Sequence, residues 1–207
     1  MSQENRVGTI LVIDDDDLHR GSLKRLLTSE GYFVLDFASA DEFLNGNISA
    51  THSPAALILD MKMPDKNGLY VQQKLKERGI EIPIIFLSGQ SFPNEIISSF
   101  KNGAFDFLLK PFDVDELLTA ISNALNFHLI QHEFHENKSQ TLKDFEALTK
   151  REKEVYALIN SGLPSIDIAA RLDISPRTIK AHKAQIMEKM NADSPQDLLK
   201  KWITIHK

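Results

Sequence analysis

The sequence predicts an α/β domain with a five-stranded, doubly wound parallel sheet, followed by a small all-α domain. Two observations carry this prediction. From residue 9 to about residue 126, short apolar runs alternate with helical stretches, as in the βα repeats of a parallel sheet covered on both faces by helices. After residue 126 no strand pattern recurs, and the remaining sequence contains four recognisable helix starts.

Each strand is expected in an apolar run of the length typical of buried parallel strands. The runs are residues 10–13, 32–35, 56–59, 83–87 and 105–109. The helices are expected at about 16–30, 39–46, 68–78, 93–102 and 113–126. Gly31, Gly79 and Gly103 follow three of these helices, where a C-terminal cap favours glycine. The polar stretch 131–141 has no clear apolar period, and we interpret it as a linker or as a continuation of the fifth helix.

The second half of the chain carries helix-capping signals. These are a capping box at 149–152, a capping serine at Ser165, and serine–proline pairs at 175–176 and 194–195. The helices expected at 165–172 and 175–190 are joined only by Asp173-Ile174, so they must cross sharply. This arrangement predicts a helix-turn-helix.

The helix expected at 175–190 has two different faces when it is read at the α-helical period. An apolar stripe contains Ile179, Ile186 and Met190, with His182 and Lys183 on its flanks. The opposite face contains Arg177, Ala181, Ala184 and Glu188, with Lys180 at its edge. Small side chains let a helix approach a groove closely, and basic ones can reach phosphates or base edges. The alternative is an ordinary solvated helix face.

Polar residues follow four of the expected strands at their carboxyl ends, namely Asp14, Asp15, Asp60, Ser88 and Lys110. In an open α/β sheet, ligands bind at this edge, where the strand order reverses. Carboxylates bind a hard divalent cation. A hydroxyl and an ammonium can hold an anion, so the set predicts a site for a metal ion and a phosphoryl group. The neighbouring acidic residues Asp16 and Asp17 are instead expected at a helix N-terminus, where negative charge is favoured.

Residues 7–126 resemble a response-regulator receiver domain, through the segments VIDDD, LILDMKMPDKNG, FLSGQ and FDFLLKPF in this order and at the usual spacing. The resemblance implies a flavodoxin-like sheet of strand order 2-1-3-4-5, with Asp60 as the phospho-acceptor. It implies that Mg²⁺ (or Mn²⁺) is bound by Asp14, Asp15, Asp60 and the backbone carbonyl of Lys62. It also implies that Ser88 and Lys110 contact the phosphoryl group, and that Ser88 and Phe107 form the switch.

Residues 146–204 resemble a LuxR-type DNA-binding domain, within which helix 175–190 would be the recognition helix. The whole chain is therefore similar to response regulators of the NarL/FixJ type, with a receiver at 1–126, a linker at 127–143 and the DNA-binding domain at 144–207. The DNA-binding residues expected on this basis are Ser175, Arg177, Thr178, Lys180, Ala181, Lys183 and Ala184. The loop 89–93 lacks the histidine-glycine-aspartate run of the FixJ branch, so the switching surface is expected to differ in detail.

The formal net charge of −5 hides an asymmetry along the chain. Residues 1–125 carry 11 basic and 18 acidic side chains, whereas residues 174–207 carry 7 and 3. The two halves are therefore expected to have different partners. The chain has no cysteine, which excludes disulfides and thiolate metal sites. No apolar run approaches the ~20 residues of a membrane span, and no apolar signal core is present, so we expect a cytoplasmic protein without a membrane partner.

The resemblance implies a transcription regulator rather than an enzyme, since a receiver catalyses only its own phosphotransfer and dephosphorylation. The expected partners are a sensor histidine kinase, double-stranded DNA and, on phosphorylation, a second copy of the chain; RNA polymerase is a further partner that the resemblance allows. Three alternatives stay open at this point. They are a phosphatase of the haloacid dehalogenase class built on Asp14 and Asp16, a regulator controlled by protein binding alone, and a helix-turn-helix used only for protein contacts.

Overall fold

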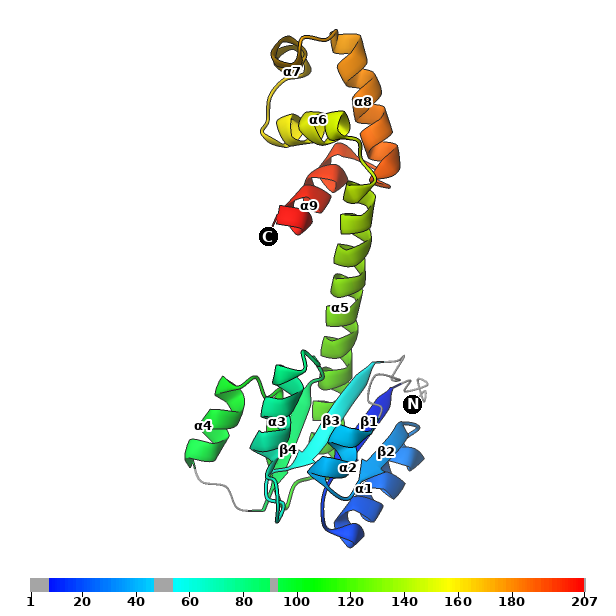
Figure 1. Ribbon diagram of the computed structural model, residues 1–207. Coiled ribbons are helices and arrows are strands. Elements are labelled where there is room, and N and C mark those ends of the chain that lie inside the picture. The colour runs from blue at the N-terminus through cyan, green and yellow to red at the C-terminus, as the bar shows by residue number, and fades with distance from the viewer. Residues whose placement is uncertain (1–7, 47–53, 90–92, 207) are drawn as a thin grey trace. The chain divides into compact units, whose positions relative to one another are not determined.

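The computed structural model describes residues 8–46, 54–89 and 93–206, and Figure 1 shows its elements. The chain divides into two compact units, residues 1–131 and residues 132–207. The first unit is built on an all-parallel sheet with strand order β2-β1-β3-β4-β5, which confirms the predicted fold class. Its strands are β1 (Thr9–Ile13), β2 (Phe33–Phe37), β3 (Ala55–Asp60), β4 (Ile84–Ser88) and β5 (Asp106–Leu109).

Helices pack on the two faces of this sheet and bury two separate apolar clusters. The helices are α1 (Asp17–Ser29), α2 (Ala40–Asn45), α3 (Gly68–Glu77), α4 (Pro93–Lys101) and α5 (Val114–Glu146). Leu27 of α1 and Ile121 of α5 pack against one face of the sheet. Phe43 of α2 and Leu75 of α3 pack against the other face. Strands β1, β3 and β4 are buried on both faces, which explains why they read as continuous apolar runs.

The expected strands, and the first four expected helices, agree with the structure to within two residues at each end. Gly31, Gly79 and Gly103 have positive φ values of 88°, 65° and 94°, as expected for glycines that end helices. The fifth helix continues to Glu146, which confirms the interpretation of 131–141 as its extension. Residues 127–143 contain no glycine or proline, so nothing in their backbone chemistry interrupts the helix.

The second unit contains the four predicted helices, α6 (Lys150–Asn160), α7 (Ser165–Leu172), α8 (Pro176–Lys189) and α9 (Pro195–His206). The capping box joins Thr149 and Glu152 through both of its hydrogen bonds. The hydroxyls of Ser175 and Ser194 each accept a backbone N–H in the first turn of the helix that they precede. The prediction that Ser165 caps α7 is wrong. Pro164 is the N-cap because its backbone is extended and its carbonyl already accepts the N–H of Ile168, so Ser165 is the first helical residue.

Helices α7 and α8 form the predicted helix-turn-helix, with Asp173 in the left-handed conformation at the turn (φ 53°). The core of this unit includes Tyr156, whose hydroxyl donates to the Leu198 carbonyl at 2.7 Å. The Trp202 ring packs edge-on against Tyr156, with 4.9 Å between the ring centroids. No helix in the described part of the chain is long and apolar enough to cross a membrane.

Candidate functional site

The carboxyl ends of β1, β3 and β5 bring three of the predicted site residues into contact. The Lys110 ammonium lies 2.5 Å from Asp60 Oδ2 and 3.3 Å from Asp14 Oδ2. Asp14 and Asp60 are both buried, with 1% and 9% of their surface exposed. The strand register explains the meeting, because Ile13 of β1 lies opposite Leu59 of β3. Asp14 directly follows Ile13 and Asp60 directly follows Leu59, so both aspartates lie at the same edge of the sheet.

Backbone N–H groups fix the orientation of both carboxylates. Asp14 Oδ1 accepts the N–H of Asp16 at 2.9 Å, and Asp60 Oδ1 accepts the N–H of Lys62 at 2.7 Å. The Asp16 carboxylate itself accepts the N–H groups of Leu18 and His19, which makes it the N-cap of α1. The expected structural role of Asp16 is thus confirmed. Since its side chain is used as a helix cap, the arrangement does not favour the phosphatase alternative built on Asp14 and Asp16.

Lys110 reaches the carboxylates from the end of β5. Its backbone N–H donates to the Ser88 carbonyl at 2.8 Å, and its peptide bond to Pro111 is cis. Burial raises the pKa of Asp14, but hydrogen bonds from the His19 side chain and the Asp16 backbone, together with the positive charge of Lys110, hold that pKa below its ordinary value of 3.8. Asp14 is therefore a carboxylate at neutral pH, and the site contains two clustered negative charges facing one ammonium.

The donor set can hold a hard divalent cation. Oδ2 atoms of Asp14 and Asp60 both converge on one positive group, the Lys110 ammonium, and carboxylate oxygens are the ligands that Mg²⁺ prefers. Asp15, the third carboxylate that the sequence predicted, is exposed. Within the described residues, no three His, Cys, Asp or Glu side chains are gathered as a metal-binding group. The structure therefore brings together two of the three predicted carboxylate ligands, with Lys110 between them.

Ser88 and Phe107 lie on the two strands beside the site. Ser88 ends β4 and is fully buried. Phe107 is partly buried in β5, and its ring packs against Phe86 with 6.2 Å between the centroids. Residues 90–92, which belong to the loop singled out in the sequence, lie outside the described residues.

Two residues of α1 that the sequence analysis did not select contact the site. His19 Nδ1 lies 2.5 Å from Asp14 Oδ2, and the Arg20 guanidinium donates to the Asp14 backbone carbonyl at 2.7 Å. Arg20 also pairs with Asp17 and with Asp36. Their position in the sequence could have indicated this role, because both lie in the first turn after the Asp16 cap, on a helix that starts at the site.

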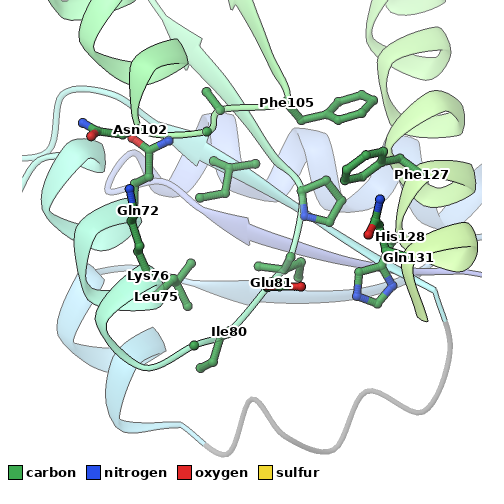
Figure 2. Close-up of a pocket in the computed structure, with 16 residues that line it drawn as sticks. Gln72, Leu75, Lys76, Ile80, Glu81, Asn102, Phe105, Phe127, His128 and Gln131 are labelled. Carbon is green, nitrogen blue, oxygen red and sulfur yellow. The ribbon is translucent and has the colours of Figure 1, made fainter. Parts of the chain in front are cut away.

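A large cavity of about 500 Å³ lies at the opposite edge of the sheet (Figure 2). Its lining includes Pro83 and Ile84 at the amino end of β4 and Phe105 just before β5. The Phe105 ring packs against Phe127 of α5, with 5.4 Å between the centroids. None of the predicted site residues lines this cavity, so the cavity is separate from the carboxylate–lysine site.

Helix α8 presents the two faces that the sequence predicted. Ile179, Ile186 and Met190 are fully buried. The expected DNA-binding residues Ser175, Arg177, Thr178, Lys180, Ala181 and Ala184 are exposed, and Lys183 is half-buried. The Ser175 and Thr178 hydroxyls are 2.8 Å apart at the start of the helix. The exposed face thus combines small side chains with basic ones, as a helix that enters a DNA groove requires.

Comparison with known proteins assigns a family to each half of the chain. Residues 10–122 match the response regulator receiver domain, and residues 146–201 match the luxR family of bacterial regulatory proteins. The response regulator protein TodT of Pseudomonas putida is 41% identical over 197 residues, which are 95% of this chain and 86% of TodT. The transcriptional regulatory protein FixJ of Rhizobium meliloti is 33% identical over 193 residues, 93% of each chain.

Solved structures give the same result. The response regulator StyR is similar with a TM-score of 0.82 and 34% identity, over 95% of this chain and 98% of StyR. Full-length FixJ from B. japonicum is similar with a TM-score of 0.59 and 31% identity, over 96% and 97% of the two chains. The chain therefore belongs to the response regulators of the NarL/FixJ type, transcription regulators in which a receiver domain precedes a LuxR-type DNA-binding domain.

Proposed function

We propose that Asp60 accepts a phosphoryl group from a sensor histidine kinase, or from a small acyl phosphate, and that this modification controls DNA binding. The observation that carries the proposal is the contact of two buried carboxylates with the ammonium of Lys110 at the carboxyl edge of the sheet. Among the residues there, Asp60 alone ends the central strand, β3.

In the transfer, an oxygen of Asp60 forms a bond to phosphorus while the bond from phosphorus to the donor's nitrogen or acyl oxygen breaks. The leaving group keeps the electron pair of that bond. The Lys62 N–H holds Asp60 Oδ1, so the Oδ2 atom stays directed toward the Lys110 ammonium, whose charge offsets that of the transferring group. Asp14, Asp60, Asp15 and the Lys62 carbonyl would hold a Mg²⁺ or Mn²⁺ ion, which would supply further positive charge there.

The phosphoryl group on Asp60 adds nearly two negative charges and three acceptor oxygens. Ser88 and Lys110 then contact these oxygens, and Phe107 turns into the space that Ser88 leaves. Phe107 of β5 packs against Phe86 of β4, the strand that ends at Ser88, which supports a link between a movement of Ser88 and the Phe107 ring. Only a difference in stability between the modified and unmodified arrangements can drive this shift.

We propose that the modified receiver forms a homodimer through the face made by α4, β5 and α5. This face exposes four apolar side chains, each about half accessible to solvent: Ile97, Phe100, Leu109 and Val114. An exposed apolar group of this kind favours association with a protein partner. Phosphorylation would reorder this face, because β5 carries Phe107 and ends next to Lys110.

The dimer would place two DNA-binding domains on the half-sites of a pseudo-palindrome, with α8 of each domain in the major groove. Lys180 and Arg177 on the exposed face of α8 suit contacts with guanine edges or phosphates. RNA polymerase is a further proposed partner. A regulator that binds chromosomal DNA would act in the cytoplasm.

Phosphorylation is tested by incubating the protein with acetyl phosphate and Mg²⁺ and measuring intact mass. The wild type should gain one phosphoryl group, and Asp60→Asn should gain none. Asp65→Asn is a matched control, since Asp65 is an exposed carboxylate in the loop that follows β3. Modification of the Asp60→Asn protein to the wild-type level would contradict the assignment.

Dimerisation is tested by light scattering with and without beryllium fluoride and Mg²⁺, together with binding to DNA of one or two half-sites. The mimic should raise the mass and tighten binding mainly to the two-half-site DNA, because the gain comes from linking two modules. Equal mass in both states, with equal tightening on both DNAs, would favour release of a masked DNA-binding domain instead.

A further inference from the structure

His19 of α1 lies at the mouth of the carboxylate–lysine site. Its Nδ1 atom is 2.5 Å from Asp14 Oδ2 and 3.2 Å from the Lys110 ammonium. The imidazole is 29% exposed, whereas the Asp14 side chain is 2% exposed. The ring also meets the Phe112 ring edge-on, with 6.5 Å between the centroids. His19 therefore contacts the site from α1 and is held in place by the segment that follows Lys110.

Hydrogen-bond chemistry fixes which ring atom carries the proton. A carboxylate oxygen only accepts hydrogen bonds and an ammonium only donates them, so Nδ1 cannot satisfy both neighbours. The shorter contact is the one with Asp14, and a lone pair on Nδ1 directed at a carboxylate oxygen 2.5 Å away would be repulsive. We assign a proton to Nδ1, which donates to Asp14 Oδ2. The Lys110 hydrogens are then directed at Asp60 rather than at the imidazole.

We propose that His19 is a positioning residue that orients the Asp14 carboxylate toward the divalent cation of the phosphoryl-transfer site. The proposal rests on the proposed function for the identity of that site. Of the Asp14 oxygens, Oδ1 is fixed by the Asp16 N–H, whereas Oδ2 lies within hydrogen-bonding distance of His19 Nδ1 and of the Lys110 ammonium. Once Lys110 turns to a phosphoryl oxygen, His19 is the remaining donor that holds Oδ2.

Carboxylates that bind metals are usually held by such outer donors, and loss of one typically weakens metal binding by about 10–100-fold. Here the effect should fall at the lower end, about 10-fold, because the Asp16 N–H still orients the other oxygen of Asp14. If His19 instead competed with the cation for Asp14 Oδ2, removing His19 would tighten metal binding. The sign of the change therefore distinguishes orientation from competition.

The experiment compares two variants of the full chain. His19→Leu removes the donor but keeps an apolar side chain beside Phe112, whereas His19→Asn places an amide N–H near the position of Nδ1. Affinity for Mn²⁺ is measured without any phosphoryl donor, by titration with electron paramagnetic resonance of the free ion. His19→Leu should bind Mn²⁺ about 10-fold more weakly than the wild type, and His19→Asn should recover most of that loss.

Phosphorylation by acetyl phosphate at varied Mg²⁺ gives a second readout. His19→Leu should need about 10-fold more Mg²⁺ for half-maximal rate while reaching a similar rate at saturation, since the residue acts through Asp14 and not on the phosphoryl group. A merely structural role would lower the saturating rate in both variants alike.

Wild-type or tighter Mn²⁺ affinity in His19→Leu would overturn the inference, as would an equal loss in His19→Asn. These results would leave the proposed function intact if Asp60 is still phosphorylated. Conversely, a wild-type protein that binds Mn²⁺ but is never modified at Asp60 would overturn the proposed function, while the two variants would still decide the role of His19. A wild-type protein that binds no Mn²⁺ would overturn the inference.

Discussion

Replacing Lys110 by methionine should destabilise the receiver unit when no divalent cation is present. Methionine keeps a flexible chain of similar length but removes the positive charge that faces Asp14 and Asp60. At an effective dielectric constant of about 20, contacts of 2.5 and 3.3 Å between unit charges correspond to a gross attraction of roughly 7 and 5 kcal/mol. Desolvation of the ammonium offsets most of this attraction.

Removing one partner of a buried ion pair typically costs about 3–5 kcal/mol, because the other partner is left buried and uncompensated. The Lys110 side chain is 23% exposed, so water can partly replace the ammonium. We therefore expect a loss of roughly 2–4 kcal/mol in the free energy of unfolding. Mg²⁺ at ten times its Kd should return about 1.4 kcal/mol to either protein. At a fixed Mg²⁺ concentration it should return more to the variant, in which no ammonium competes for the carboxylates.

The single tryptophan separates the two units in the assay. Trp202 packs in the core of the second unit, so its fluorescence follows that unit, whereas far-UV circular dichroism follows both. In urea, the Lys110→Met protein should show an earlier transition by circular dichroism and an unchanged transition by fluorescence. Lys101→Met is the control, because Lys101 is exposed at the end of α4. A Lys110→Met protein as stable as the wild type without Mg²⁺ would refute the charge argument.

Three further predictions concern other parts of the chain. Lys180→Ala should weaken operator binding by about 1–3 kcal/mol if Lys180 reads a base, or reduce the salt slope by about one if it contacts phosphate, as measured by fluorescence anisotropy. Burial raises the pKa of Glu152, but hydrogen bonds from Lys189 and a backbone N–H hold that pKa below its ordinary value of 4.5. The ionised Glu152 therefore stabilises the fold above that pH, and this stabilisation is lost as the pH falls through the folded-state pKa. Urea midpoints followed by tryptophan fluorescence should fall with pH in the wild type and less so in Glu152→Gln. Gly68→Ala should cost about 1–3 kcal/mol and slow phosphorylation, because its Cβ would lie 2.8 Å from the Asp60 backbone carbonyl oxygen.

The sheet and the α8 faces could be predicted because burial dictates their residue patterns. Strands covered on both faces, such as β3, must be apolar throughout, and the register then carries Asp60 to the carboxyl edge. The Ile179 stripe follows from the helical period alone. The cap of α7 was harder to predict, because Pro164 and Ser165 both suit a helix start and the choice depends on where the chain enters the helix.

The contact of His19 with Asp14 could not be derived from the sequence. A histidine in the first turn of a helix has many possible neighbours. The residue that it contacts depends on its side-chain conformation and on the Phe112 ring from a distant segment. The exposure of Asp15 could not be predicted from the sequence either. Asp14 and Asp15 are adjacent residues that follow the same strand, and only the backbone direction after β1 decides which carboxylate turns inward.

If Asp60 is phosphorylated as proposed, the arrangement of charges would link cation binding to recognition of the phosphoryl group. A phosphoryl oxygen on Asp60 would compete with the two carboxylates, at 2.5 and 3.3 Å, for the Lys110 ammonium. Moving the ammonium away from Asp14 would leave a buried carboxylate beside the negatively charged phosphorylated Asp60, which is costly unless another cation replaces the ammonium. A divalent cation at these oxygens would therefore make the lysine available. The lysine in turn lowers the affinity for that cation in the unmodified protein, so Lys110→Met should bind Mn²⁺ more tightly than the wild type while it is phosphorylated more slowly.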